Sequence, residues 1–167
     1  MSAPTTGLES LLDQPSLLLK RLVLLGGGMY FAFVAVTNAI NFIASVGGLH
    51  WTFLNSGNVA YIASVTKVDS FPVWANDTVV LLAALAEGFG AFLFARALLR
   101  FRGDGAGVRA VWHALCWNVV VWLGFIAGTE FFTAYTSEGP FRELLIIALA
   151  MAVVIAVVPD RIPPERA

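Results

Sequence analysis

Four long apolar runs constrain the fold of this sequence more than any other feature. They cover residues 22–46, 74–101, 111–135 and 141–158. A helix needs about 20 mostly apolar residues to cross the hydrocarbon core of a bilayer, and each run approaches or exceeds that length. Of the 167 residues, 59% are hydrophobic and 13% are charged, whereas a soluble domain has about 25% charged residues. The sequence therefore predicts an all-α bundle of four transmembrane helices, with residues 1–167 forming one domain.

A more polar segment, residues 47–73, separates the first two runs. Within it, apolar side chains recur at helical spacing, namely Tyr61, Ile62, Val65 and Val68. This pattern indicates a short amphipathic helix lying in the membrane interface. A loop packed over the bundle would account for the same residues, so both interpretations stay open.

Local signals mark several helix ends. Asn76 is placed to cap the N-terminus of the second membrane helix, and Pro140 is placed to open the fourth. The proline-rich tail, residues 159–167, is predicted to be disordered. Cys116, the single cysteine, lies inside an apolar run and is expected to be a small buried residue.

Basic residues give the expected orientation of the bundle. Cytoplasmic loops of membrane proteins carry an excess of lysine and arginine. Here the basic residues gather before the first run, between the second and third, and after the fourth: Lys20, Arg21, Arg96, Arg100, Arg102, Arg109, Arg161 and Arg166. The other two loops contain Lys67 and Arg142. We therefore expect both termini to be cytoplasmic and the amphipathic segment to lie outside.

Two carboxylates interrupt the apolar runs. Glu87 falls near the middle of the second run, and Glu130 lies in the outer third of the third. A charged side chain in hydrocarbon costs from ~3 to more than 10 kcal/mol by different measures, so both should face the bundle interior. Asn38 and Asn41 lie at the depth of Glu130, which predicts a polar cluster between the first and third helices. Arg142, at the outer start of the fourth helix, is expected to form an ion pair with Glu130.

These polar side chains have two candidate roles. Hydrogen bonds between transmembrane helices contribute about 0.6 kcal/mol on average and act as structural links. Intramembrane carboxylates are also the usual components of proton and ion pathways. The nearby Arg142 favours the structural role for Glu130, whereas both roles stay open for Glu87.

Small residues predict where helices approach one another closely. Gly124 and Gly128 form a GxxxG pair in the third run, and Ala84 and Gly88 have the same spacing in the second. Such faces let transmembrane helices pack with their backbones close together. The glycines at positions 26–28 either loosen the first helix or admit a neighbouring helix.

Several classes of function lack the residues that they need. No basic patch interleaved with aromatics indicates a nucleic-acid partner. His50 and His113 lie near opposite faces of the membrane, and neither belongs to a cluster with metal-ligand spacing, so we expect no metal and no cofactor. The sequence also lacks a nucleophile paired with a base and a glycine-rich phosphate loop, which predicts a protein that is not an enzyme.

Several short motifs resemble one family, the small bacterial integral membrane proteins called domain of unknown function 2165. The matching pieces are "TNAINF" (37–42), "NVAYIASVTKVDSFP" (58–72), "LAEGFGAFL" (85–93), "GTEFFTAY" (128–135), "PFREL" (140–144) and "VVPD" (157–160). The resemblance implies four spans and a bacterial inner-membrane location, and it implies no established reaction. It singles out Asn38, Asp69, Pro72, Glu87, Glu130, Phe141 and Arg142. The family often has an acidic residue where Asn41 stands and a histidine near Ser64.

Three functions agree with these residues. The first is a non-enzymatic accessory or scaffold subunit of a larger inner-membrane complex, with other membrane subunits or further copies of the chain as partners. The second is a small oligomeric proton-coupled carrier that uses Glu87 and Glu130. The third is a lipid- or quinone-binding subunit, with its site formed under the amphipathic segment by Trp51, Phe53 and Tyr61.

Overall fold

The computed structural model describes residues 14–48, 51–69, 71–101 and 105–159, and these contain helices, turns and loops but no strand. The elements in chain order are α2 (Pro15–Ser45), α3 (Asn58–Val65), η1 (Thr66–Asp69), α4 (Val73–Arg100), α5 (Gly105–Phe131), η2 (Tyr135–Ser137) and α6 (Gly139–Val157). Here η1 and η2 are short 3-10 helices. The predicted all-α architecture is confirmed.

Four of these helices are long and apolar enough to cross a membrane. They are α2, α4, the Gly107–Phe131 part of α5, and α6, with lengths of 31, 28, 25 and 19 residues. Each covers most of one of the four apolar runs of the sequence, and the third run extends four residues beyond the end of α5. The predicted four-helix bundle is therefore confirmed, although α2 begins at Pro15, well before the first apolar run.

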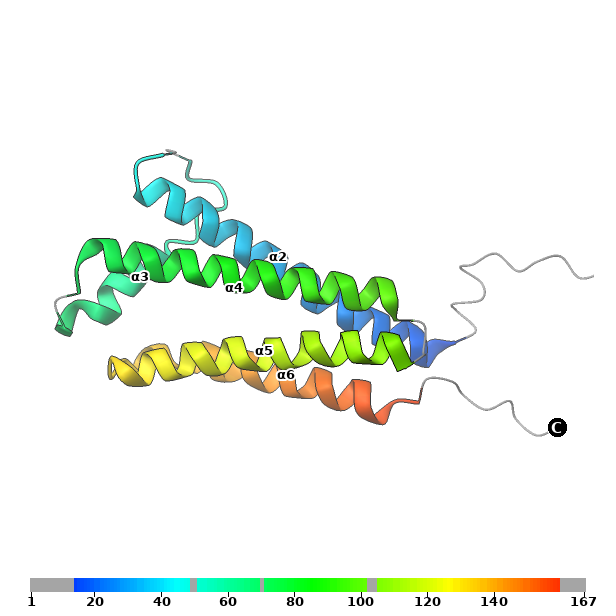
Figure 1. Cartoon of the computed structure of the whole chain (residues 1–167). Helices are drawn as coiled ribbons and strands as arrows, with labels where there is room; N and C mark the ends of the chain where they lie inside the picture. Colours follow the sequence, from blue (N-terminus) through cyan, green and yellow to red (C-terminus); the bar gives the residue numbers. More distant parts are fainter. Residues whose placement is uncertain (1–13, 49–50, 70, 102–104, 160–167) are drawn as a thin grey trace, which may run out of the picture.

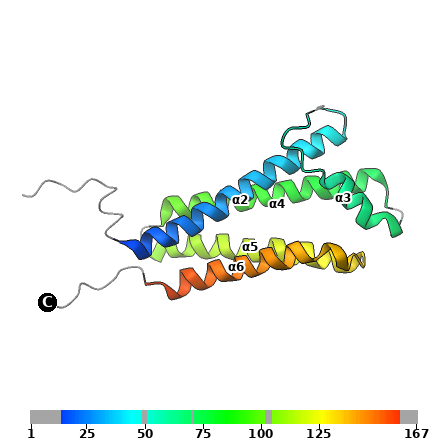
Figure 2. The ribbon, with the colours of Figure 1, turned by 180° about the vertical axis from the view of Figure 1, so that it is seen from behind.

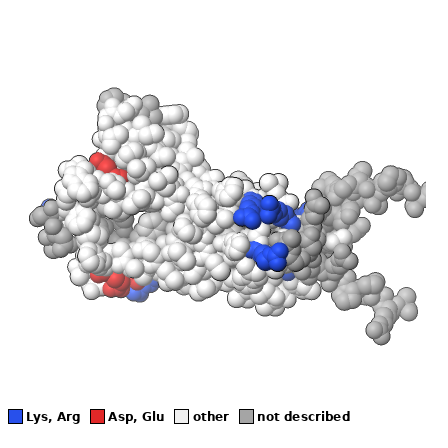
Figure 3. Space-filling view, viewed as in Figure 1, with Lys and Arg blue, Asp and Glu red and all other residues white. Residues whose placement is uncertain are grey.

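The helices form two pairs that diverge toward one end of the molecule. α2 packs along α4, α4 along α5, and α5 along α6, while α3 lies against α4. At the end that carries Arg96 and Arg100, which we call the arginine end, the four long helices come together (Figures 1 and 3). Toward the other end, the α3 end, α2 and α4 separate from α5 and α6 (Figures 1 and 2). The bundle is thus closed at one end and splayed at the other.

A stack of aromatic rings closes the middle of the bundle. The ring of Phe31, on α2, stacks on Phe94 of α4 at 5.8 Å and on Trp122 of α5 at 5.6 Å between centroids. Two glycines make room for these rings. A Cβ on Gly90 would lie 2.9 Å from Phe31, and one on Gly27 would lie 2.7 Å from Phe94. Gly27 therefore admits a neighbouring helix, which was one of the two interpretations of the glycines at 26–28.

The other predicted packing residues divide into two groups. Ala84 is buried, and a Cβ on Gly88 would lie 4.0 Å from that of Ala35, so this face of α4 packs on α2. By contrast, a Cβ on Gly124 or Gly128 would meet no atom within 4 Å. The prediction that this GxxxG pair brings two helices together is wrong within this chain, because α5 presents the pair to a groove that no helix fills.

Local predictions had mixed outcomes. Residues 58–65 form a helix, α3, which decides between the two interpretations left open for this segment. As predicted, α6 has a proline in its first turn, and it begins at Gly139. Asn76 does not cap α4, because the helix already begins at Val73 and the buried Asn76 amide instead accepts a hydrogen bond from Thr66.

Cys116 is exposed rather than buried, because α5 turns this residue away from its neighbours. The predicted disordered tail (159–167) and His50 lie outside the described residues, except for Pro159.

The glycine contacts predict how stability responds to two matched substitutions. Gly90→Ala inserts a methyl group against the clamped ring of Phe31, and overpacking of this kind costs about 1–3 kcal/mol. Gly26→Ala adds the same group where nothing lies within 4 Å. Because both positions are helical, the change in helix propensity cancels in the comparison. We expect G90A to unfold about 1–3 kcal/mol more easily than G26A in detergent-solubilised protein, and equal stability would contradict the packing described here.

Candidate functional site

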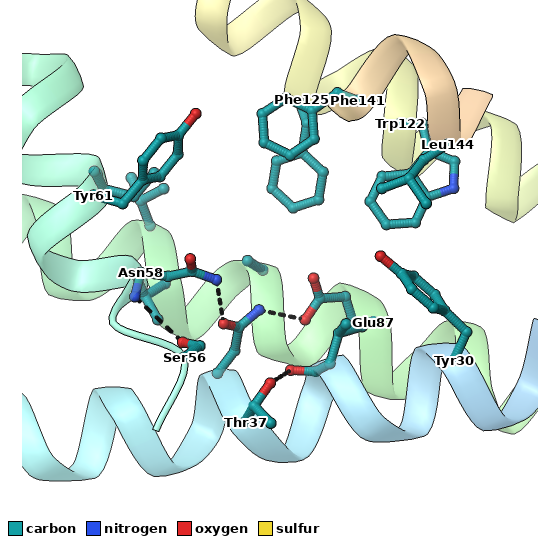
Figure 4. Close-up of a pocket in the computed structure, with 16 residues that line it drawn as sticks. Tyr30, Thr37, Ser56, Asn58, Tyr61, Glu87, Trp122, Phe125, Phe141 and Leu144 are labelled. Carbon is teal, nitrogen blue, oxygen red and sulfur yellow. Dashed lines mark hydrogen bonds between the residues drawn. The ribbon is translucent and has the colours of Figure 1, made fainter. Parts of the chain in front are cut away.

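A buried carboxylate, Glu87, lies at the centre of the candidate site. It faces α2 from the same side of α4 as Val80 and Ala84, since residues three, four and seven apart share one face of a helix. The Asn38 side chain donates a hydrogen bond from Nδ2 to Glu87 Oε2 at 2.7 Å. Asn58, the first residue of α3, in turn donates from Nδ2 to Asn38 Oδ1 at 2.6 Å. A chain of hydrogen bonds therefore runs from α3 through α2 to α4 (Figure 4).

A cavity of about 220 Å³ lies beside this chain of hydrogen bonds. One side of it is polar and the rest is mainly apolar, as Figure 4 shows. The polar side carries Thr37, Asn38, Ser56, Asn58 and Glu87, and the apolar walls carry Val34, Ile62, Val79, Val80, Ala83, Trp122, Phe125, Phe141 and Leu144, with Tyr30 and Tyr61 contributing hydroxyl groups. Most small-molecule pockets have this composition, in which a few polar groups are set in an apolar wall.

The free edge of Glu87 points into the cavity. Its Oε2 atom accepts the bond from Asn38, while no hydrogen bond reaches Oε1 from the described residues. Figure 4 shows this second oxygen directed toward the space between the aromatic walls and the Tyr30 hydroxyl. An ionised carboxylate can accept about four hydrogen bonds. The site therefore offers an unused acceptor to any molecule that enters it.

Aromatic residues close the cavity toward the arginine end. Trp122 lines the cavity and also belongs to the aromatic stack with Phe31. Its indole N–H donates to Asn118 Oδ1 at 2.6 Å, which fixes the orientation of the ring. Phe125 of α5 and Phe141 of α6 stack at 5.1 Å and line the cavity across from Glu87 and Asn58 (Figure 4). The cavity thus belongs to the splayed half of the bundle.

Asparagine side chains hold the connection between α2 and α3 in place. Asn41 donates from Nδ2 to Asn55 Oδ1 at 2.5 Å, and its Oδ1 accepts from the backbone N–H of Val59 at 2.7 Å. Gly57, whose φ of +70° favours glycine, lets the chain turn directly into α3. These bonds fix the start of α3 and so position Asn58 beside Asn38.

A second hollow, a groove of about 430 Å³, runs between α4 and α5. Its walls include Leu82 and Ala86 on α4 and Trp117, Val120 and Gly124 on α5. The groove and the cavity have six lining residues in common: Tyr61, Ile62, Val79, Ala83, Phe125 and Phe141. The two hollows therefore adjoin beneath α3.

The structure rearranges the predicted polar cluster. Glu130 is exposed and, among the described residues, forms no hydrogen bond with Asn38 or Asn41, so the cluster forms around Glu87 instead. The predicted Glu130–Arg142 ion pair is also wrong. Arg142 pairs with Glu138, one helical turn before it, because residues four apart lie on the same face of a helix.

The predicted aromatic contacts are separated in the structure. Tyr61 lines both hollows, and its hydroxyl donates to the Ser137 carbonyl at 3.3 Å. Trp51 and Phe53 stack on each other at 6.4 Å and line neither hollow. Tyr30 and Asn58 also belong to the site, although neither residue had been predicted from the sequence. Tyr30 stands seven residues before Thr37, a spacing that would have placed it on the polar face of α2.

No family model, no curated protein and no solved structure matches this chain. The resemblance to domain of unknown function 2165 therefore stays a prediction. Among the described residues, no group of three or more His, Cys, Asp or Glu side chains is placed to hold a metal ion.

The hydrogen bond between Asn38 and Glu87 can be measured with a double-mutant cycle. Asn38→Ala and Glu87→Ala should couple by about 0.6–1.7 kcal/mol, the range found between transmembrane helices. Asn38 shares no hydrogen-bond partner with Asn118. The control cycle of Asn38→Ala with Asn118→Ala should therefore be nearly additive. Unfolding free energies in detergent provide the readout, and the absence of coupling in the first cycle would contradict the contact.

Proposed function

We propose that this protein is a non-enzymatic membrane protein that binds an amphipathic small molecule, of the lipid or quinone class, in the cavity beside Glu87. One observation carries the proposal: a buried carboxylate with a free oxygen faces a cavity whose other walls are mainly apolar. This site is a relocated form of the lipid or quinone site expected from the sequence, with Tyr61 as the residue common to both.

Electrostatics favours a ligand with a hydrogen-bond donor in its polar part. A carboxyl oxygen that faces a mainly apolar cavity gains from a hydrogen-bond donor placed beside it. Asn38 satisfies one oxygen of Glu87, and a hydroxyl or amine from a ligand would satisfy the other. The aromatic walls would meanwhile cover the apolar part of the same molecule.

The aromatic stack favours binding over transport. A carrier needs a route to both membrane faces, whereas Phe31, Phe94 and Trp122 fill the space between the cavity and the arginine end. The proton-coupled carrier predicted from the sequence would therefore require these rings to move apart. The structure favours a binding site that opens toward one end of the bundle.

The accessory-subunit hypothesis is retained as a second candidate. Only Ala148 and Ile155 are buried among the 19 residues of α6. Its exposed apolar side chains, Ile146, Ile147, Leu149, Val153 and Val157, are available to lipid or to another membrane subunit. A ligand-binding protein with so much free helix surface is suited to act within a larger assembly.

We also propose a bacterial inner-membrane location with the arginine end in the cytoplasm. The positive-inside rule supports this orientation, because Arg96, Arg100 and Arg109 lie at that end and the α3 end carries few basic residues. The ligand cavity would then lie in the outer half of the membrane.

Substitution of two glutamates tests the binding site. Glu87→Gln removes the charge while nearly preserving the shape, and loss of a charged hydrogen bond of about 1.5–3 kcal/mol corresponds to at least tenfold weaker binding. Native mass spectrometry of protein extracted in mild detergent should show a bound lipid or quinone mass that E87Q retains at least tenfold less. Glu130→Gln, the same change at an exposed carboxylate, should retain it fully. Equal occupancy in both variants, or no bound mass in the wild type, would refute the proposal.

Cysteine labelling tests the orientation. In a Cys116→Ser background, Lys67→Cys places a thiol at the α3 end and Arg109→Cys places one at the arginine end. A membrane-impermeant maleimide added to intact spheroplasts should label the first variant and leave the second unlabelled until the membrane is opened. The reverse pattern would invert the proposed topology.

A further inference from the structure

The groove between α4 and α5 differs from the cavity in its polarity. Four of its lining residues have polar side-chain groups, and each of these groups already has a partner. The Tyr61 hydroxyl bonds to Ser137, Thr66 to Ile62 and Asn76, the Trp117 indole to the Ala86 carbonyl, and Thr129 to the Ile126 carbonyl. The groove therefore presents no free polar side chain to an occupant.

The groove is also open to the side of the bundle. Leu82 and Val120 on its rims are 59% and 55% exposed. One and two turns beyond Val120 on α5, Gly124 and Gly128 leave space, since a Cβ at either position would meet nothing within 4 Å. Neither glycine has a positive φ, so the backbone does not require glycine there. Their absent side chains instead deepen the groove.

Continuity with the cavity indicates what lies in the groove. Six residues line both hollows, and the side chains of Tyr61 and Phe125 are among them. One hollow offers the free carboxylate oxygen of Glu87, and the other offers an apolar path to the membrane. This division matches the two ends of a single amphipathic molecule.

We propose that the ligand is a single-chain amphiphile whose donor-bearing head lies against Glu87 in the cavity and whose chain leaves the bundle sideways through the groove past Gly124 and Gly128. The inference rests on the proposed function and adds the class of ligand and its route. A molecule of this kind would enter from the surrounding leaflet without crossing the aromatic stack.

Filling the groove tests the inference. Gly128→Leu places a side chain in open space within the groove, and Gly26→Leu makes the same change where nothing lies within 4 Å on α2. The probe is a monoacylglycerol with an 18-carbon chain and a diazirine near the middle of that chain, added to protein in phosphatidylcholine nanodiscs. The readout is photolabelling that excess unlabelled monoolein abolishes, mapped by peptide mass spectrometry.

In the wild type, we expect photolabelling of residues 79–86 of α4 and 117–128 of α5, and we expect excess monoolein to abolish it. G128L should lower it about tenfold, G26L should change it less than twofold, and both variants should unfold at the wild-type temperature. E87Q should also lower it, because the head loses its acceptor. Equal labelling of G128L and G26L, or wild-type labelling spread evenly over all exposed helix faces, would overturn the inference.

The two proposals fail in different ways. If G128L has no effect while E87Q still loses the co-purified molecule, the head site stands and the chain route is wrong. If E87Q keeps both the co-purified molecule and the photolabelling, the proposed function itself is wrong. Loss of folding in G128L would appear as a lowered unfolding temperature, and Gly124→Leu then provides the second variant in the same groove, with the same expected loss of labelling.

Discussion

The hydrogen bond from Asn38 to Glu87 is the interaction on which the rest of this structure depends. A carboxylate at the middle of a membrane helix is tolerated only where other groups compensate for the loss of water. Asn38 supplies one such group from α2, and Asn58 extends the compensation to α3. Because the Asn38 amide accepts from Asn58 and donates to Glu87, the chain of amides polarises toward the carboxylate. The helix that carries Glu87 is thereby linked to α2 and to the segment that follows it.

This arrangement explains why one half of the bundle is closed and the other open. Toward the arginine end, the helices are joined by close apolar contacts, in which glycines leave room for the rings of Phe31 and Phe94. Toward the α3 end, side-chain amides replace interlocking rings between α2 and its neighbours. A hydrogen bond between side-chain amides links two helices without requiring that the space around it be filled. The helices of this half are therefore held together although a cavity lies between them.

Sequence patterns predicted the features that depend on long segments. The apolar runs predicted four helices long enough to cross a membrane, and of the two carboxylates predicted to face inward, Glu87 is buried and Glu130 is exposed. The rotation of each helix about its axis could not be predicted, because it depends on tertiary packing. Adjacent helical residues point about 100° apart, and α5 turns Thr129 inward and Glu130 outward. That rotation also placed Gly124 and Gly128 on a groove instead of a helix contact, and left Arg142 with Glu138 as its partner.

The attachments of α3 have a mechanical consequence. Asn41 and Asn58 join its beginning to α2, and Thr66, immediately after it, bonds to Asn76 of α4. Toward the other helix pair, the Tyr61 hydroxyl donates a hydrogen bond to the Ser137 carbonyl. If the two helix pairs move relative to each other about the aromatic stack, α3 moves together with α2 and α4. The hydrogen bond from Tyr61 to Ser137 opposes this motion, and its loss would widen the opening between the two helix pairs.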